Sequence, residues 1–272
     1  GSVCPVPKRA VSKVFDMPLM DFFRFTKPEN INARSWAGLI IAVIALITAI
    51  QGVNEATPAT TPSQSYFDAP LDLEQTIANT KQSLVTLKCG DFLGSGWAID
   101  IDWSILKNPD EIALINEYPS AVITNHHVLE DCINDSSLPV SAVIGATGLE
   151  RDYVIWNWNE ENDLALVVVK SKLKPLTEAI DTPAPGWWTM AIGSPWQFNS
   201  SVSIGNLISS DTSITNYDLI TTSLLNPGNS GGPLINSRGE VIGTNTWGMN
   251  DSELGFYNIA TSTSALCELL DC

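Results

Sequence analysis

The sequence has few histidines and, after residue 53, little positive charge. Only two histidines occur among its 272 residues. Residues 1–53 carry six Lys and Arg against three Asp and Glu, whereas the remainder carries eight against 27, a formal charge of -19. A surface that acidic repels phosphate backbones and anionic lipid head groups. We therefore expect no nucleic-acid partner.

Clustered metal ligands are also missing from the sequence. The five cysteines and two histidines show no paired zinc-type spacing, so we expect no metal and no other cofactor. No basic residue lies between Arg34 and Lys81, and residues 35–54 carry no charge. A helix of that length, rising about 1.5 Å per residue, crosses a hydrocarbon core of about 30 Å. The sequence therefore predicts a single transmembrane helix at residues 35–54, embedded in the lipid bilayer.

The charges beside this segment set its orientation. Basic residues before it keep residues 1–34 in the cytoplasm as a short tail, and the rest of the chain crosses the membrane. A cleaved signal peptide is the alternative, although its basic region would be long. Residues 55–70, rich in Thr, Pro, Ser and Ala, are then an extended spacer. Residues 71–272 form the globular domain, placed in the periplasm or outside the cell.

The globular region is rich in short β-like runs separated by turns, which is typical of all-β barrels or sandwiches. Six runs lie on each side of a proline-rich link at residues 174–185. The runs are residues 83–88, 96–100, 121–124, 140–145, 151–158, 164–169, 188–193, 201–208, 219–223, 233–236, 240–247 and 255–259. Residues 71–82 and 262–270 are predicted to be short helices, and residues 103–119 a long loop.

One glycine-flanked loop carries a serine. Residues 225–234 read LNPGNSGGPL and place Ser230 just before an apolar run. Because glycine lets a ligand approach the backbone closely, the amides around Gly228, Asn229 and Ser230 are candidates for an oxyanion site, with Gly228 and Ser230 as the donors. A plain turn between two strands is the alternative, since Asn, Pro and Gly are common turn residues.

A serine nucleophile needs a base, and the base needs an orienting carboxylate. The two histidines are adjacent, in TNHHV at residues 124–128. Asp163 opens the apolar run at residues 164–169 and is the best candidate for the carboxylate, because it would lie at the rim of a core. The three groups then follow one another in the order His, Asp, Ser.

Five segments in this order resemble the trypsin-like serine proteases of the HtrA (Deg) type. They are GSGW at 94–97, TNHHV at 124–128, NDLA at 162–165, AIGSP at 191–195 and the serine loop. The resemblance implies two six-stranded antiparallel β-barrels with the active site between them. It also implies a catalytic triad of His127, Asp163 and Ser230. His126 is then expected to be a solvent-facing neighbour of the base.

The resemblance implies a disulfide as well. Many trypsin-like proteases bridge the regions that hold Cys89 and Cys132, and a bridge there would fix the histidine loop. Buried free thiols are the alternative. A second bridge, between Cys267 and Cys272, requires the closing helix to end between them, because bridged Cα atoms lie within about 7 Å.

The same resemblance locates substrate-binding residues. Thr246, Trp247 and Gly248 are similar to the family segment that pairs with substrate as an added strand, although they can equally be a plain strand end. Leu224 and Leu225 are expected to form the pocket floor. Neither is acidic, so cleavage after small or medium apolar residues is favoured over cleavage after Lys or Arg.

Together these features predict a serine endopeptidase that cleaves unfolded or exposed polypeptide segments outside the cytoplasm, in quality control or processing. At the position of Asn229, trypsin-type digestive enzymes carry an aspartate that pairs with a freshly cut N-terminus during activation. Asn229 has no charge to form this ion pair, so the resemblance predicts activity without zymogen cleavage. The chain stops soon after the protease-like region, so we expect no PDZ domain, and assembly into a homo-oligomer stays open. An inactive chaperone-like or scaffold protein with the same fold, or an esterase with the same triad, are the alternatives.

Overall fold

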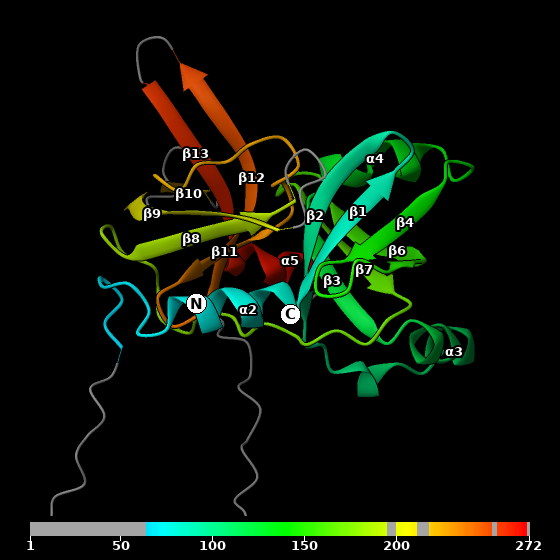
Figure 1. Ribbon diagram of the computed structural model, residues 1–272. Helices are drawn as coiled ribbons and strands as arrows, with labels where there is room; N and C mark the ends of the chain where they lie inside the picture. The colour runs from blue at the N-terminus through cyan, green and yellow to red at the C-terminus, as the bar shows by residue number, and fades with distance from the viewer. Residues whose placement is uncertain (1–63, 195–199, 211–217, 252–254, 271–272) are drawn as a thin grey trace, which may run out of the picture. The chain divides into compact units, whose positions relative to one another are not determined.

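The computed structural model describes residues 64–194, 200–210, 218–251 and 255–270 (Figure 1). The predicted cytoplasmic tail, the transmembrane segment at residues 35–54 and most of the predicted spacer lie outside these residues, as does Cys272. Within the described part of the chain, no helix has both the length and the apolar character needed to cross a membrane.

The first half of the domain is an antiparallel sheet of seven strands in the order β5-β4-β1-β2-β3-β7-β6. Its strands are β1 (Leu84–Cys89), β2 (Phe92–Ile99), β3 (Ser120–Thr124), β4 (Val140–Ile144), β5 (Glu150–Arg151), β6 (Tyr153–Asn159) and β7 (Leu164–Val169). The sheet curls so that β4 and β6 come into contact.

The prediction of a six-stranded barrel was therefore wrong for this half. The extra strand arises because Glu150 and Arg151 pair with Val143 and Ala142 of β4. The chain bends at Asp152 and continues as β6, so the single predicted run divides into two strands that lie at opposite edges of the sheet. The result is a curled half-barrel.

The second half is a closed barrel of six strands in the order β10-β13-β12-β11-β8-β9, as predicted. Its strands are β8 (Trp188–Gly193), β9 (Ser201–Ser209), β10 (Asp218–Thr221), β11 (Pro233–Asn236), β12 (Val241–Asp251) and β13 (Gly255–Ser262). Strands β12 and β13 continue beyond the barrel as a two-stranded ribbon (Figure 1).

Short helices connect and cover the sheets. They are α2 (Leu73–Lys81), a 3₁₀ turn at Trp103–Ile105, α3 (Pro109–Glu117), α4 (His126–Asn134), a 3₁₀ turn at Thr263–Ala265, and α5 (Leu266–Leu269). Helix α3 corrects the expected loop at residues 103–119. Asn108 caps the amide of Asp110, and Pro109 occupies the first helical position, where its missing N–H costs nothing.

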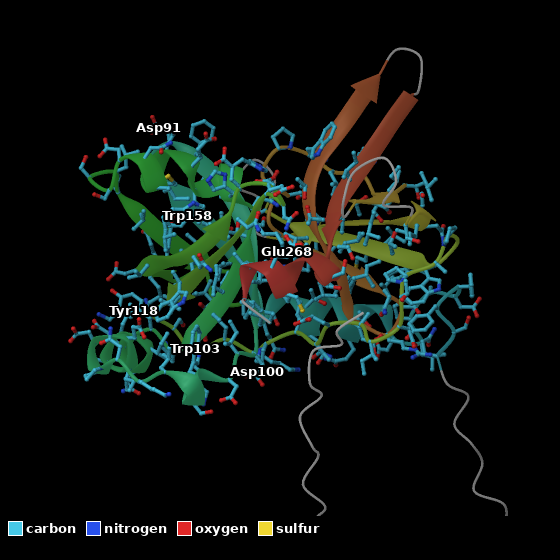
Figure 2. The ribbon with its side chains drawn as sticks, turned by 180° about the vertical axis from the view of Figure 1, so that it is seen from behind. Asp91, Asp100, Trp103, Tyr118, Trp158 and Glu268 are labelled. Carbon is cyan, nitrogen blue, oxygen red and sulfur yellow. A yellow bond between two sulfur atoms is a disulfide. The ribbon has the colours of Figure 1, made fainter. Side chains whose placement is uncertain are left out.

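Helix α5 joins the two halves. It follows the last strand of the barrel, yet Leu266 and Leu269 are buried in one cluster with Trp97 of the first half and Met190 of the second. Figure 1 shows α5 lying between the halves, and Figure 2 shows its Glu268 from behind. The predicted closing helix is thus present, but its α-helical part is a single turn.

A disulfide fixes α4 to the first sheet. Cys89, the last residue of β1, is bonded to Cys132 of α4, with 5.8 Å between their Cα atoms. The bridge implied by the family resemblance is therefore present. The pairing of Cys267 with Cys272 stays a prediction, since Cys272 is not among the described residues.

The chain just before α2 packs on the second barrel. Tyr66 stacks on Trp187 with 3.8 Å between ring centroids, its carbonyl accepts from the amide of Trp188, and the Arg238 guanidinium lies 3.8 Å from its ring. The predicted spacer at residues 55–70 therefore does not extend to residue 70, because its last residues from 64 onward belong to the compact unit.

Candidate active site

The candidate base lies at the start of α4. Strand β3 ends at Thr124, Asn125 is the N-cap of the helix, and His127 occupies the second helical position. The His127 side chain is 44% exposed, whereas His126 is only 8% exposed. The expectation that His126 faces solvent was therefore wrong: of the two neighbours, His127 is the accessible one.

Both carboxylate oxygens of Asp163 contact His127. Its Oδ2 lies 2.7 Å from His127 Nδ1, and its Oδ1 accepts from the His127 backbone amide at 2.9 Å. The second contact places a carboxylate at a helix N-terminus, where negative charge is favourable. The predicted acid and base are therefore in contact, and the histidine ring is oriented through Nδ1.

The backbone at Asp163 is held in an uncommon conformation. Its φ is +49°, a left-handed value that non-glycine residues adopt at a cost of about 1–3 kcal/mol. Three contacts hold this turn: the two to His127, and a hydrogen bond of 2.8 Å from Asn125 Nδ2 to the Asp163 carbonyl. The neighbouring Asn162 donates to Glu268 of α5 at 2.6 Å, so the turn is also tied to the closing helix.

The serine loop is a compact turn between β10 and β11. The amide of Asn229 donates to the carbonyl of Asn226 at 2.9 Å, and the amide of Gly232 donates to the carbonyl of Asn229 at 3.0 Å. Gly228 has a φ of +99°, which requires glycine in practice. Hydrogen bonds within the loop and the glycine therefore both contribute to the loop geometry.

Two of the three loop amides make no hydrogen bond within the described part of the chain, and one does. Among the described residues, no carbonyl or side chain accepts from the amides of Gly228 and Ser230. The amide of Asn229 is already used within the loop. Of the three residues predicted around the oxyanion site, Gly228 and Ser230 therefore have amides without an acceptor in the described residues, whereas the Asn229 amide is occupied.

His127 and Ser230 line the same cavity, which has a volume of about 260 Å³. Within the described part of the chain no hydrogen bond joins their side chains. The Ser230 hydroxyl instead donates to the carbonyl of Thr246 at 2.9 Å. The acid–base half of the predicted triad is assembled, and the serine faces the same space with its hydroxyl turned toward β12.

The other walls of this cavity include most of the predicted substrate-binding residues. The lining residues besides His127 and Ser230 are Leu225, Asn226, Pro227, Thr246, Trp247 and Gly248. Leu224 is not among them: its side chain is 54% exposed. Asn226 and Pro227 were not singled out from the sequence, although they belong to the same loop as Ser230.

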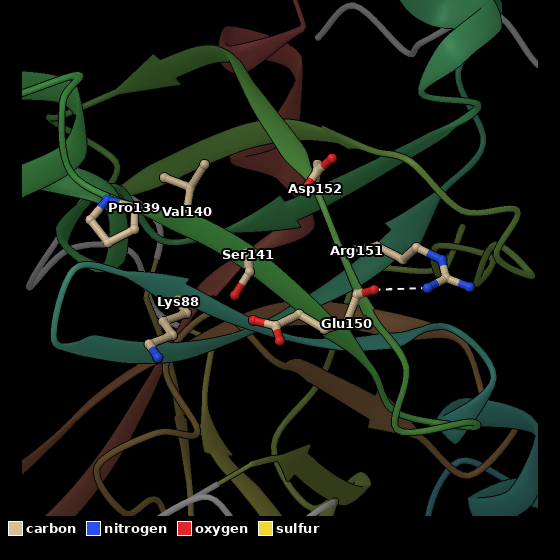
Figure 3. A pocket seen from close by; sticks show the side chains of 7 residues that line it. All are labelled: Lys88, Pro139, Val140, Ser141, Glu150, Arg151 and Asp152. Atoms are coloured by element: carbon tan, nitrogen blue, oxygen red, sulfur yellow. Dashed lines mark hydrogen bonds between the residues drawn. The ribbon is translucent and has the colours of Figure 1, made fainter.

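A second hollow, of about 490 Å³, lies within the first half against β1, β4 and β5 (Figure 3). Lys88, Glu150, Arg151 and Asp152 place charges of both signs around it, and the Arg151 side chain donates to the carbonyl of Glu150 at 2.8 Å. It contains no histidine and no serine–base pair. In the described residues no group of three His, Cys, Asp or Glu side chains is arranged to hold a metal ion.

A closed antiparallel barrel beside a curled sheet, with candidate catalytic groups contributed by both, defines the chymotrypsin-like fold class. The chain belongs to the family of trypsin-like peptidase domains, whose model matches residues 94–243.

The curated relatives that the chain resembles include proteins named as DegP-like and HhoB serine proteases. The chain is 31% identical over 160 residues to a protein from Marinomonas sp. (strain MWYL1) named as a DegP-like periplasmic serine endoprotease. It is 33% identical over 152 residues to a protein from Synechocystis sp. (strain PCC 6803) named as the serine protease HhoB. The matches cover 57% and 50% of this chain, and 29% and 34% of the relatives, so the chain spans about a third of their length.

Solved structures show the same fold. The serine endoprotease from Yersinia pestis superimposes with a TM-score of 0.58 at 22% identity, covering 75% of this chain and 67% of that one. Deg5 superimposes with a TM-score of 0.55 at 21% identity, covering 71% of this chain and 90% of that one. At sequence identities this low, the similarity to these structures is a similarity of fold alone.

Proposed function

We propose that the chain is a serine endopeptidase in which His127 is the base, Asp163 orients it and Ser230 is the nucleophile. The observation that carries the proposal is the shared cavity: an exposed histidine, held through Nδ1 by a carboxylate, faces the same space as the serine of a glycine-flanked loop. Oriented base and nucleophile are the two parts that acyl transfer needs first.

In the proposed reaction, Ser230 Oγ attacks the carbonyl carbon of a peptide bond while its proton passes to His127. The carbonyl oxygen becomes an oxyanion that accepts from the amides of Gly228 and Ser230. His127 then gives the proton to the leaving amine, and a water molecule hydrolyses the acyl-enzyme by the same sequence of transfers. The Ser230 hydroxyl must first turn from the Thr246 carbonyl toward the histidine, which is a rotation about χ1.

The substrate is proposed to be an unfolded or exposed polypeptide segment with a small or medium apolar residue before the scissile bond. Support comes from the cavity walls: Leu225 and Pro227 are apolar, and none of the described residues that line the cavity is acidic and able to pair with Lys or Arg. Trp247 and Gly248 lie on β12 at the cavity, so an extended peptide can pair with that strand.

The setting is proposed to be extracytoplasmic, in quality control or processing, with residues 35–54 as the membrane anchor and residues 1–34 in the cytoplasm. Relatives named as periplasmic and the disulfide between Cys89 and Cys132 support an oxidising compartment. Extraction with alkaline carbonate tests the anchor, because release of the intact protein from membranes would contradict it.

The test of the activity uses Ser230→Ala. Wild-type protein should cleave an unfolded protein and peptides with Val or Ala before the scissile bond, and it should be labelled by a fluorophosphonate. Ser230→Ala should lose both reactions, by about 10³-fold or more. Ser136→Ala, which changes an exposed serine on the first half, is the matched control and should behave like wild type. Cleavage that survives in Ser230→Ala would refute the assignment.

A second candidate is an inactive protein that binds unfolded chains in the same cavity. The orientation of the Ser230 hydroxyl toward Thr246 instead of His127 favours it. The labelling experiment separates the two, because an inactive protein would bind an unfolded polypeptide in wild-type form without reacting with the fluorophosphonate.

Preferential cleavage after Arg over Val would overturn the proposed specificity while leaving the activity intact.

A further inference from the structure

Ser95 is a buried polar residue outside the predicted triad that contacts the serine loop from the opposite half of the domain. It lies in the middle of β2, between Gly94 and Gly96, and is 0% exposed. A serine in the interior of a strand gains nothing from burial unless its hydroxyl is hydrogen-bonded. The partners of that hydroxyl are therefore informative.

All polar groups of Ser95 are used, and most of them reach the second half. Its Oγ donates to the carbonyl of Gly228 at 2.6 Å and accepts from the amide of Ser194 at 2.9 Å. Its backbone amide donates to the carbonyl of Ser230 at 2.7 Å. Its own carbonyl accepts from Thr124 Oγ1 at 2.7 Å. One residue of the first half thus holds two carbonyls of the serine loop.

Two glycines of the second half make this close approach possible. A Cβ placed on Gly231 would lie 2.1 Å from the Ser95 carbonyl oxygen, and one placed on Gly193 would lie 2.9 Å from Ser95 Oγ. A backbone-to-Cβ distance near 2 Å is far inside van der Waals contact. Larger residues at either position would separate Ser95 from the loop.

The contact to Gly228 lies beside a loop peptide that makes no hydrogen bond of its own in the described residues. The peptide that carries the Ser230 amide is held through the Asn229 carbonyl, which accepts from Gly232. The peptide that carries the Gly228 amide makes no hydrogen bond through its carbonyl or its amide in the described residues. Its orientation depends on the next peptide, whose carbonyl Ser95 holds, through the left-handed φ of Gly228.

We infer that Ser95 is a positioning residue of the oxyanion site: by binding the Gly228 carbonyl, it fixes the turn at Gly228 so that the Gly228 amide can act as a donor together with the amide of Ser230. The inference rests on the proposed function for its catalytic consequence. Loss of an entire oxyanion donor costs about 10²–10³ in kcat. Ser95 acts one peptide away from the donor, so its removal should cost less, about 10- to 100-fold.

Ser95→Ala tests this with substrate and inhibitor pairs. The kcat for an apolar peptide should fall about 10- to 100-fold while KM stays within about threefold, because the donor acts on the transition state and not on the bound peptide. The affinity for a peptide aldehyde, which forms an oxyanion-bearing adduct with Ser230, should fall by a similar factor. The affinity for the matching peptide alcohol, which forms no adduct, should not change.

Ser83→Ala is the matched control. Ser83 is also 0% exposed and its hydroxyl also bonds a carbonyl, that of Lys174, away from the serine loop. It should lower stability without separating aldehyde affinity from alcohol affinity. If Ser95→Ala does not fold, Ser95→Cys retains a weak donor at similar volume and should fall between wild type and the alanine effect.

Hydrogen exchange of residues 226–232 supplies a readout that does not depend on activity. Exchange there should be faster in Ser95→Ala than in Ser83→Ala. The inference is overturned if exchange and kcat in the folded Ser95 variants match those of wild type, or if aldehyde and alcohol affinities fall together. A wild type that neither cleaves nor labels would sink the proposed endopeptidase instead, and the exchange comparison would still decide whether Ser95 holds the loop.

Discussion

The two halves of the domain reach stability by different means. In the second half, six strands close into a barrel, so every strand pairs on both sides. In the first half, seven strands curl without closing and leave β5 and β6 as edges. Exposed edges invite pairing with other chains unless they are short or covered. β5 has only two residues, and α5 lies against β6 through a hydrogen bond from Asn157 to the Leu269 carbonyl.

The open half therefore relies on two additions besides its own strand pairing. The disulfide joins β1 to α4, and α5, which comes from the end of the chain, packs against β6 and β7. Both additions act near the candidate acid and base: α4 holds His127, and α5 holds Asn162 beside Asp163. The geometry of the base therefore depends on supports that come from distant parts of the sequence.

Removing the disulfide should produce the largest difference in stability between the two halves. Cys89→Ala combined with Cys132→Ala frees a loop of 43 residues, which should lower the free energy of unfolding by roughly 4 kcal/mol. The melting temperature should fall by about 10 °C. Hydrogen exchange should increase in α4 and β1 and stay near wild type in β8 and β11.

Reductant provides the control for the cysteine pair. Dithiothreitol should lower the melting temperature of wild type far more than that of the double variant, because the variant has already lost this bond. Equal loosening of both halves in the exchange experiment would contradict the idea that the disulfide supports the open half.

Leu269→Ala should have the next largest effect. Leu269 is 1% exposed in the cluster that α5 shares with both halves. Truncation of a buried leucine costs about 2–5 kcal/mol, and the lost contacts here are those that seat α5 on the open sheet. Urea unfolding measures the change. Leu71→Ala, at a leucine that is 85% exposed, should change the midpoint little. A Leu269 variant as stable as the Leu71 variant would show that α5 does not support the sheet.

The sequence predicted strands well because each carries local signals. The runs at residues 164–169 and 188–193 match β7 and β8 to the residue, since both are fully buried and bounded by turns. The open form of the first sheet could not be predicted in the same way. It depends on the pairing of Glu150 and Arg151 with β4 as a separate strand, whereas the sequence placed Arg151 in one run with residues 152–158.

In the candidate site, too, residues in local motifs could be predicted from the sequence, whereas contacts between distant residues could not. His127, Asp163 and Ser230 stand in short motifs that a family resemblance can select, and the contact between His127 and Asp163 agrees with that selection. Helix α3 was missed although Asn108 and Pro109 are a recognisable start signal. Ser95 belongs to a motif that was noted as GSGW, but its role depends on the serine loop 133 residues away, and no local pattern reports that contact.

A change at Tyr66 tests the stability of the closed barrel. Tyr66→Phe keeps the stacking on Trp187 but removes the hydroxyl contacts to Asp181, 2.6 Å, and Arg238, 2.7 Å. Because the barrel is closed by its own strands, the loss should be small, about 1 kcal/mol, as for one hydrogen-bonded hydroxyl. Urea unfolding at pH 8 should show this difference.

The same variant should reveal a dependence on alkaline pH. Burial and the hydrogen bond to Asp181 raise the pKa of Tyr66 to about 12, above its ordinary value of 10.0. A raised pKa in the folded state means that the hydroxyl contributes stability below pH 10 and loses that contribution as the pH rises toward 12. The advantage of wild type over Tyr66→Phe should therefore shrink between pH 9 and pH 11. Phe67→Leu, at an exposed neighbour without an ionisable group, should differ from wild type by a constant amount over this range. If the Tyr66→Phe difference is equally constant, the hydroxyl is not held as the structure places it, and the segment before α2 is attached without a contribution from that hydroxyl.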